Sequence, residues 1–310
     1  MNNYHTSALL QETIQGLKVK PNERYIDATL GGGGHSFEIL KRGGLVLGID
    51  VDKDALEFVG GRWKIENARF AARRGKWKIA EKNLTLVRGN FREIDKIALL
   101  NNFNNISGII FDLGVSSHQI DSSERGFSFQ NQGPLDMRMD QELGVKALDL
   151  IKILTKGELY EIFTKYGEES SAWAISENIV KSRSIKPIET TIELARVIEI
   201  GLKSKGLNNS FTRAGQSKKV FQALRIAVND ELNSIGEALP KAVGQLCKQG
   251  RLCVISFHSL EDRIVKKAFI EFENKKMGKI ITEKPIIPGT QELIDNPRVR
   301  SAKLRIFEKL

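Results

Sequence analysis

Short apolar runs recur along the chain and are separated by stretches in which the apolar residues have helical spacing. The runs cover 25–28, 45–50, 84–88, 106–112, 251–257 and 302–310. Unbroken apolar strands that alternate with helices are typical of a parallel sheet with helices on both faces. The pattern therefore predicts an α/β, Rossmann-like fold with a mostly parallel sheet.

The middle of the chain has a different pattern. A polar, glycine-containing stretch leads into consecutive helical patterns with no strand between them, at 145–155, 157–166, 168–183, 189–203 and 215–248. We therefore expect one α/β domain built from residues 1–117 and 213–310, interrupted by an inserted all-helical domain at 118–212.

A glycine-rich turn follows the first predicted strand, in the sequence Asp27-Ala-Thr-Leu-Gly31-Gly-Gly33-Gly34-His35. Glycines at such a turn let the backbone approach a ligand closely, and the next helix presents free N–H groups at its N-terminus. Asp50 ends the second strand, 17 residues after Gly33. A carboxylate there can accept hydrogen bonds from both ribose hydroxyls of an adenosine. These features fit either a dinucleotide or S-adenosylmethionine (SAM).

The residues after the glycines separate these two ligands. The dinucleotide fingerprint requires glycine or alanine at its third position, where the two registers of this loop place Ser36 or Phe37. By contrast, Asp27 followed by glycines resembles the motif of SAM-dependent methyltransferases. SAM is therefore the expected cofactor. The structural alternative is a glycine-rich turn with Asp50 as the N-cap of a helix.

Two further residues map to the same edge of the predicted sheet. Phe91 follows the third strand, where an aromatic ring suits the face of an adenine, and Asp112 ends the fourth strand. Ligands of open α/β sheets bind beyond the carboxyl ends of the strands. Taken singly, Phe91 is more often a core residue and Asp112 more often a helix cap.

The net charge of the chain indicates what kind of partner it binds. The 310 residues include 48 basic and 38 acidic side chains, a formal net charge of +10. Two segments hold this surplus: residues 62–82, with eight basic and two acidic residues, and residues 263–310, with twelve and six. A polyanionic partner such as nucleic acid is therefore expected.

Composition also excludes several classes of protein. No run approaches the roughly 18 apolar residues of a membrane helix, and no secretory signal is recognisable, so we expect a cytoplasmic protein with no membrane contact. The two cysteines and four histidines are too scattered for a disulfide framework or a local zinc site, and we expect no metal.

The segment at 62–82 contains an internal repeat, GRWKI and GKWKI, fourteen residues apart. Trp63, Phe70 and Trp77 recur every seven residues, which predicts one aromatic stripe along a helix. Basic residues beside aromatic ones suit phosphate contact and base stacking in RNA. The alternative is a short helical extension whose aromatic residues dock on the domain while its charges are solvated.

Long motifs carry a family resemblance over nearly the whole chain: YHTSALLQETI, DATLGGGGHS, DLGVSSHQIDSSERGFSFQNQGPLDMRMD, FQALRIAVNDEL, GRLCVISFHSLEDRIVKKAF and NPRVRSAKLRI. In these motifs the chain resembles the RsmH (MraW) family of SAM-dependent cytosine-N4 methyltransferases of small-subunit ribosomal RNA. The resemblance implies a class I methyltransferase fold and a helical insert that helps to recognise RNA. It also implies methylation of the cytidine at conventional position 1402 of 16S rRNA, in the decoding centre.

The resemblance also implies roles for single residues. The SAM contacts that it implies are Gly33, Gly34, His35, Asp50, Phe91, Asp112 and Gln119. Three positions depart from the family: Lys219 stands for an arginine, His118 for a proline and Ile120 for a leucine. A lysine keeps the charge for a phosphate contact at 219 but not the bidentate geometry of arginine. The segment at 62–82 is an insertion relative to the family.

Methyl transfer from a sulfonium is an in-line displacement, so the protein mainly supplies alignment and a dry site. The cytosine N4 shares its lone pair with the ring and must lose a proton, which calls for an acceptor on its N–H group. We expect Asp112 and the carbonyls of the following loop to line this site, with Ser116 and Ser117 as polar contacts. The alternative is that Asp112 binds only the methionine end of SAM.

Other residues are candidates for the RNA side. His258 follows the fifth strand at the same edge. It either has a substrate role, in which it orients the cytosine or carries the N4 proton, or it is a hydrogen-bonded structural histidine. The candidates for holding a nucleotide flipped out of the RNA are Arg125, Phe127, Asp136 and Arg138. Arg298 and Arg300 either clamp phosphate or form ion pairs that hold the C-terminal strand.

Three functions remain open at this point. The first is the ribosomal RNA methyltransferase, the second an NAD-linked oxidoreductase, and the third a non-catalytic assembly factor that binds ribosomal RNA and keeps SAM as a structural ligand. The expected partner is 16S rRNA or the small ribosomal subunit, and the sequence leaves a homodimer open.

Overall fold

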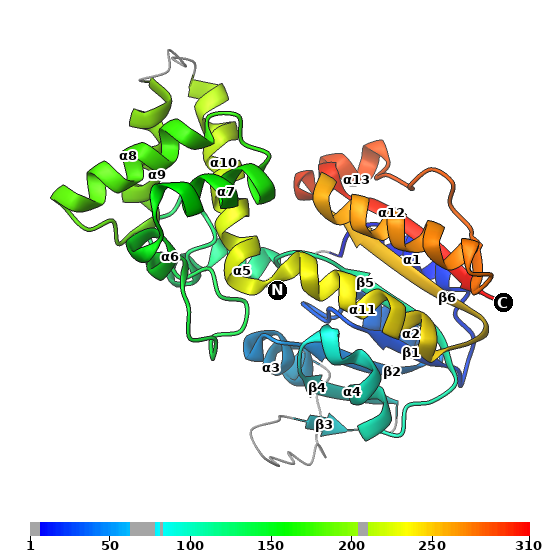
Figure 1. Ribbon diagram of the computed structural model, residues 1–310. Helices are drawn as coiled ribbons and strands as arrows, with labels where there is room; N and C mark the ends of the chain where they lie inside the picture. Colours follow the sequence, from blue (N-terminus) through cyan, green and yellow to red (C-terminus); the bar gives the residue numbers. More distant parts are fainter. Residues whose placement is uncertain (1–6, 63–77, 81–82, 204–209) are drawn as a thin grey trace. The chain divides into compact units, whose positions relative to one another are not determined.

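The computed structural model describes residues 7–62, 78–80, 83–203 and 210–310. The chain divides into two compact units, one built from Met1–Ser116 and Leu232–Leu310 and the other from Ser117–Glu231 (Figure 1). Most of the basic repeat, including Trp63, Phe70 and Trp77, lies outside the described residues. Residues Lys78–Ala80 form a strand, so the predicted helix does not extend over them.

The first unit contains a sheet whose eight described strands have the order β3-β4-β2-β1-β5-β6-β8-β7. The five central strands are parallel: β4 (Leu84–Arg88), β2 (Leu45–Asp50), β1 (Arg24–Asp27), β5 (Ile106–Asp112) and β6 (Leu246–Ser256). The outer strands are antiparallel to their neighbours: β3 (Lys78–Ala80), β7 (Gly278–Ile280) and β8 (Lys303–Lys309). The predicted Rossmann-like α/β fold with a mostly parallel sheet is therefore confirmed, whereas β3 and β7 were not predicted.

Helices cover both faces of this sheet. One apolar layer contains residues of α1 (Leu10–Leu17), α2 (Gly34–Lys41) and α3 (Lys53–Arg62), and the other contains residues of α4 (Ile94–Leu100), α11 (Glu231–Gln245) and α12 (Ser259–Asn274). The shorter elements of this unit are η1 (Phe91–Glu93), α13 (Thr290–Asp295) and η3 (Pro297–Ser301). The strands are apolar on both sides because both of their faces are buried.

The parallel strands all end at one edge of the sheet. Asp27 at the end of β1 pairs with Gly48 of β2 and Ile110 of β5. Asp112 at the end of β5 pairs with Ile255, one residue before the end of β6. The registers therefore bring the strand-end residues to one carboxyl edge, as the sequence predicted.

The second unit is helical in its described part, apart from one isolated bridge between Pro134 and Thr190. Its elements are α5 (Ser117–Asp121), η2 (Ser123–Arg125), α6 (Ala147–Ile153), α7 (Lys156–Gly167), α8 (Ala172–Ile185), α9 (Thr191–Lys203) and α10 (Ser210–Asn229). They enclose a separate apolar core that includes Phe163, Ile175 and Ile198. Among the described residues no helix has the length and apolarity that a membrane span requires.

Two boundaries differ from the sequence-based expectation. The single helix predicted over 215–248 is wrong, because the chain breaks between α10 and α11 at Asp230, whose φ is 50°. The second compact unit extends to Glu231 rather than to the expected boundary at 212. The physical reason is that Val220, Phe221 and Leu224 of α10 belong to the helical unit's core.

Candidate functional site

The glycine loop between β1 and α2 has a backbone that side chains would disturb. Gly31 and Gly33 have φ angles of 48° and 73°, in the left-handed region that glycine adopts without strain. A Cβ at Gly33 would lie 2.9 Å from Cγ2 of Val59, and one at Gly34 would collide with the side chain of Ser7. The loop therefore needs glycine at 31 and 33 for conformation, and at 33 and 34 for packing.

Asp50, at the end of β2, holds this loop. Its carboxylate accepts hydrogen bonds from the N–H groups of Gly31 (2.8 Å) and Asp52 (2.9 Å). The capping role in α3 belongs to Asp52 instead, because Oδ1 of Asp52 accepts from the N–H of Asp54 at 3.1 Å. Each carboxylate oxygen of Asp50 has a second lone pair, which leaves acceptor capacity for ribose hydroxyls.

Burial raises the pKa of Asp50 to about 7, although the N–H groups of Asp52 and Gly31 that donate to it act in the opposite direction. The unfolded chain has the ordinary carboxyl pKa of 3.8. At a pH between 3.8 and about 7, folding therefore binds a proton at Asp50. The free energy of unfolding is therefore expected to decrease as the pH rises from about 4 to about 7.

The Asp50→Asn variant tests this titration. Because the variant lacks the titrating group, the Tm of the cofactor-free protein should vary less between about pH 5 and about pH 7 than that of the wild type. Thermal denaturation followed by circular dichroism across this range measures the difference. Equal pH slopes for the two proteins would contradict a raised pKa at Asp50.

Asp27 and Asp112 lie with His35 at the same edge. The buried carboxylate of Asp27 accepts from Oγ of Ser36 (2.7 Å) and from the N–H of Thr29 (3.3 Å). The N–H of Asp112 donates to Oγ1 of Thr29 at 2.6 Å, and Oδ2 of Asp112 lies 3.8 Å from Nδ1 of His35. Burial raises the pKa of Asp27, while the charge of His35 acts in the opposite direction. Two acids and a histidine thus share this part of the edge.

These residues fit a cationic adenosine-type ligand. Within the described part of the chain, the buried Nε2 of His35 has no hydrogen-bond partner, whereas buried polar atoms normally have one. Asp27, Asp50 and Asp112 also gather carboxylates where strands β1, β2 and β5 end. Such a site attracts the positive sulfonium and amino groups of SAM.

Phe91 follows β4 at the start of η1. Oδ1 of Asn90 accepts from the N–H of Arg92 at 2.9 Å, which caps this short helix. The Phe91 ring packs edge-on against Phe111, with 5.5 Å between ring centroids, and is only partly buried. Both expectations for Phe91 are therefore compatible with its position, since one side of the ring contacts the core and part of it stays exposed at the edge.

His258 is the N-cap of α12, directly after β6. Its Nδ1 accepts from the N–H of Glu261 at 3.4 Å. The fully buried Glu261 carboxylate in turn accepts from the N–H groups of Phe257 (2.7 Å) and His258 (3.2 Å). This reciprocal capping box gives His258 a structural role. Its substrate role stays a prediction.

The loop after Asp112 leads from the sheet into the helical unit. Ser116 is the last residue of the first unit, and Ser117 and Gln119 lie in α5 of the second. Gln119 is buried and the two serines are half-buried. Their predicted contacts with substrate and cofactor stay predictions.

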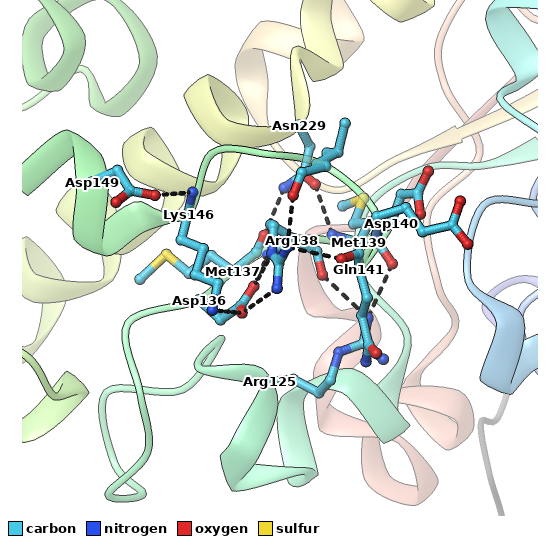
Figure 2. A network of polar contacts seen from close by, with 12 residues as sticks. Arg125, Asp136, Met137, Arg138, Met139, Asp140, Gln141, Lys146, Asp149 and Asn229 are labelled. Carbon is cyan, nitrogen blue, oxygen red and sulfur yellow. Dashed lines mark hydrogen bonds and ion pairs between the residues drawn. The ribbon is translucent and has the colours of Figure 1, made fainter.

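Arg138 and Asp136 form the centre of a polar network within the helical unit (Figure 2). The Arg138 guanidinium donates to both carboxylate oxygens of Asp136, at 2.7 and 2.8 Å, and to the carbonyls of Gln141 and Leu143. Burial would raise the pKa of Asp136, but the hydrogen bonds from Arg138 outweigh it and hold this pKa below its ordinary range. The Arg138 side chain therefore fixes its own loop.

Two more side chains tie this loop down. Asn229 at the end of α10 donates to the carbonyl of Met137 and accepts from the N–H of Met139, at 2.8 and 2.7 Å (Figure 2). The buried Arg125 donates to the carbonyls of Arg138 and Met139. The residues predicted to hold a flipped nucleotide are thus engaged with one another, which favours a structural part for Arg125, Asp136 and Arg138.

The Arg138→Lys variant separates the two roles of Arg138. A lysine cannot reproduce the bidentate contact and both carbonyl contacts, so we expect a loss of roughly 1–3 kcal/mol in the free energy of unfolding. Urea denaturation gives this value, and RNA binding is measured in parallel under conditions where the variant is folded. A lower RNA affinity with unchanged stability would show that the guanidinium serves substrate instead.

The remaining RNA candidates lie in different environments. Phe127 is half-buried against the helical core, with the Arg125 guanidinium 6.0 Å from its ring centroid. Nζ of Lys219 donates to the carbonyl of Glu168 at the C-terminal end of α7, at 3.1 Å. Arg298 and Arg300 are exposed on η3, immediately before β8. Their phosphate contacts stay predictions.

Sequence reasoning missed the residues that support the site rather than line it. Thr29 and Ser36 fix Asp112 and Asp27, and Glu261 fixes the turn at His258. For Glu261 a signal was present, since a capping residue followed three positions later by glutamate is a helix-start pattern. For Thr29 and Ser36 no local pattern indicated the partner.

Comparisons with known proteins agree over the full length of the chain. A family model described as the MraW methylase family matches residues 2–310. "Ribosomal RNA small subunit methyltransferase H" of Lachnospira eligens is 41% identical over 99% of this chain and 98% of its own. The protein of the same name from Halothermothrix orenii is 43% identical over the same shares. Among solved structures, an rRNA methylase from Streptococcus thermophilus is 13% identical over 96% of this chain and 95% of its own, with a TM-score of 0.44.

Proposed function

The chain belongs to the MraW methylase family, and from this premise we propose that it is a SAM-dependent methyltransferase that methylates cytosine N4 in small-subunit ribosomal RNA. Its target is the cytidine at conventional position 1402 of 16S rRNA, in the decoding centre, as the family resemblance implies. The observation that carries this function is the set of three strand-end carboxylates around the glycine loop and His35.

The chain's own residues account for binding of the cofactor. The glycine loop admits the backbone close to the ligand, and the Asp50 carboxylate accepts from the ribose hydroxyls. Phe91 lies against the adenine, and Nε2 of His35 pairs with a polar group of the methionine part. Gln119 completes these contacts. When bound, SAM supplies an electrophilic methyl group on a sulfonium.

Asp112 acts on the nucleophile. Its carboxylate accepts the N4–H of the cytosine, which loosens the conjugation of the nitrogen lone pair and receives or relays the proton that N4 loses. The hydrogen bond from its N–H to Thr29 fixes the end of β5, so the carboxylate is held in place before substrate arrives. Ser116 and Ser117 add polar contacts to the base, and His258 orients the base from the end of β6.

Four further residues are assigned to contacts with the RNA. Lys219, Arg298 and Arg300 contact phosphate, and Phe127 contacts the flipped nucleotide. The partner is 16S rRNA or an assembled small subunit, which places the protein in the cytoplasm, and a homodimer is compatible with this function. The NAD-linked alternative has little support, because Ser36 or Phe37 stands where the dinucleotide fingerprint requires glycine or alanine.

A transfer assay with purified protein tests the function. The protein is incubated with methyl-labelled SAM and either 16S rRNA or small subunits from cells that lack the gene, and the labelled nucleoside is identified after digestion. We expect N4-methylcytidine. RNA binding and SAM binding without any transfer to either substrate would support the non-catalytic assembly factor instead.

A further inference from the structure

Residues 7–9 pack against the start of α2, where the glycine loop ends. The three atoms nearest to a Cβ added at Gly34 all belong to Ser7. The Cβ of Ser7 would lie at 3.1 Å and its backbone nitrogen at 3.9 Å, while its Oγ would collide with the added atom. Unlike Gly31 and Gly33, Gly34 does not have a left-handed φ, so its backbone would accept an alanine. The contact with Ser7 is therefore what requires a glycine at this position.

The next two residues belong to the apolar core behind the loop. Ala8 and Leu9 are buried in the same cluster as Leu30 of the glycine loop and Phe37 of α2. Because side chains in a protein core are closely packed, a shift of residues 7–9 is transmitted to the loop and to the start of α2.

Leu9 has a backbone conformation that its surroundings must stabilise. Its φ of 49° and ψ of 39° lie in the left-handed region, which an L-residue with a bulky side chain rarely adopts. Its N–H donates to Oε1 of Glu292 in α13, at 2.7 Å. The next residue of α13, Leu293, packs against the same apolar cluster. Strained residues of this kind persist where neighbouring groups hold them and are often found near functional sites.

We propose that residues 7–9 support the SAM site from the side of Gly34, and that Glu292 is the positioning residue that holds them there. The contacts run from Glu292 to Leu9 and from Ser7 to Gly34, and all four residues lie in the first unit. The proposal rests on the proposed function, in which the glycine loop binds the cofactor. Without Glu292 these residues leave the strained conformation, and SAM binding then has to order them again, which lowers the affinity.

A compensating pair of substitutions tests the contact between Ser7 and Gly34. Gly34→Ala should weaken SAM binding roughly tenfold, because the added Cβ overlaps the Ser7 side chain. Combining it with Ser7→Gly removes the two closest atoms and leaves the backbone nitrogen at 3.9 Å, so most of the lost affinity should return. Calorimetric titration with SAM measures each affinity. A double variant as weak as Gly34→Ala would show that the added methyl group meets the cofactor instead, and would overturn the proposal.

A second set of variants tests the positioning role of Glu292. Glu292→Ala should weaken SAM binding roughly 3- to 10-fold while kcat at saturating SAM stays close to that of the wild type. Glu292→Gln should keep most of the affinity, because its amide oxygen accepts the same hydrogen bond. Asp295→Ala is the matched control, since Asp295 is an exposed acid of the same helix whose carboxylate accepts from Gln291. It should bind SAM like the wild type.

The Tm of each variant is measured in parallel. A role of Glu292 in stability alone would lower the Tm of Glu292→Ala but leave the SAM affinity of the folded protein unchanged, which would overturn the proposal. An equal loss of affinity in Asp295→Ala, or in Glu292→Gln and Glu292→Ala alike, would also overturn it. In each of these cases methyl transfer by the wild type still supports the proposed function. A wild-type protein that neither binds SAM nor methylates the RNA would contradict both.

Discussion

Replacing Asp112 by asparagine should reduce methyl transfer far more than it reduces SAM binding. The substitution preserves size and the backbone hydrogen bond to Thr29 but removes the negative charge at the end of β5. A positioned proton acceptor contributes roughly 10²–10⁴-fold to a rate, so we expect kcat to fall by this order. The SAM affinity of the variant should fall far less than kcat, because the carboxylates of Asp27 and Asp50 remain at the same edge.

Single-turnover methyl transfer and calorimetric titration with SAM measure the two quantities separately. If Asp112 binds only the methionine part of SAM, the variant loses affinity and activity together, and saturating SAM restores much of its rate. A rate restored by saturating SAM would show that Asp112 does not act on the cytosine N4. A rate that stays low at saturating SAM places the carboxylate beside N4.

Replacing Gly33 by alanine should abolish most of the affinity for SAM. The residue's φ of 73° costs an L-residue about 1–2 kcal/mol, and its new Cβ would press on Val59 and Phe37. To relieve this contact the start of α2 has to move, and the glycine loop that binds the cofactor moves with it. A displacement that costs about 1.4–2.8 kcal/mol of binding corresponds to a roughly 10- to 100-fold weaker affinity.

Two other glycines provide matched controls. Gly31 has a φ of 48° but no atom closer than 4.0 Å to an added Cβ, so Gly31→Ala carries strain without a clash and should lose less affinity. Gly61, in α3, has open space and helical geometry, so Gly61→Ala should leave SAM binding unchanged. Equal affinities for the Gly33→Ala and Gly61→Ala variants would contradict the close fit of the loop.

The sequence predicted the carboxyl edge well because each part of it follows from local chemistry. Apolar strands fix a parallel sheet, parallel strands end at one edge, and Asp27, Asp50 and Asp112 each end one of these strands. The glycine loop is equally local, since the left-handed φ of Gly31 and Gly33 needs glycine whatever surrounds it.

Tertiary partners determined what the sequence could not predict. Asp136 and Arg138 were interpreted as substrate contacts because the partners of their loop meet it only in the folded unit: the carbonyls of Gln141 and Leu143 accept from Arg138, and the side chain of Asn229 bonds the backbone of Met137 and Met139. No local signal brings a residue of α10 to a loop 90 positions earlier in the chain.

The break between α10 and α11 shows a similar limit. Proline is the strongest helix breaker, yet Pro240 lies inside α11 and the chain breaks at Asp230. Arg225 and Glu231 form a bidentate ion pair across the break, with distances of 2.8 and 2.9 Å. Aspartate tolerates the left-handed conformation better than most residues, but this tolerance alone does not locate a break.

The most direct test of the proposed function is the modification of 16S rRNA in cells. Ribosomal RNA is isolated from the wild type, from a strain with the gene deleted, and from the deletion strain carrying either the gene or its Asp112→Asn variant. Mass spectrometry of the fragment that contains position 1402 should show N4-methylation in the wild type and the complemented strain, and its loss in the other two. Unchanged N4-methylation in the deletion strain would contradict the function proposed for this protein.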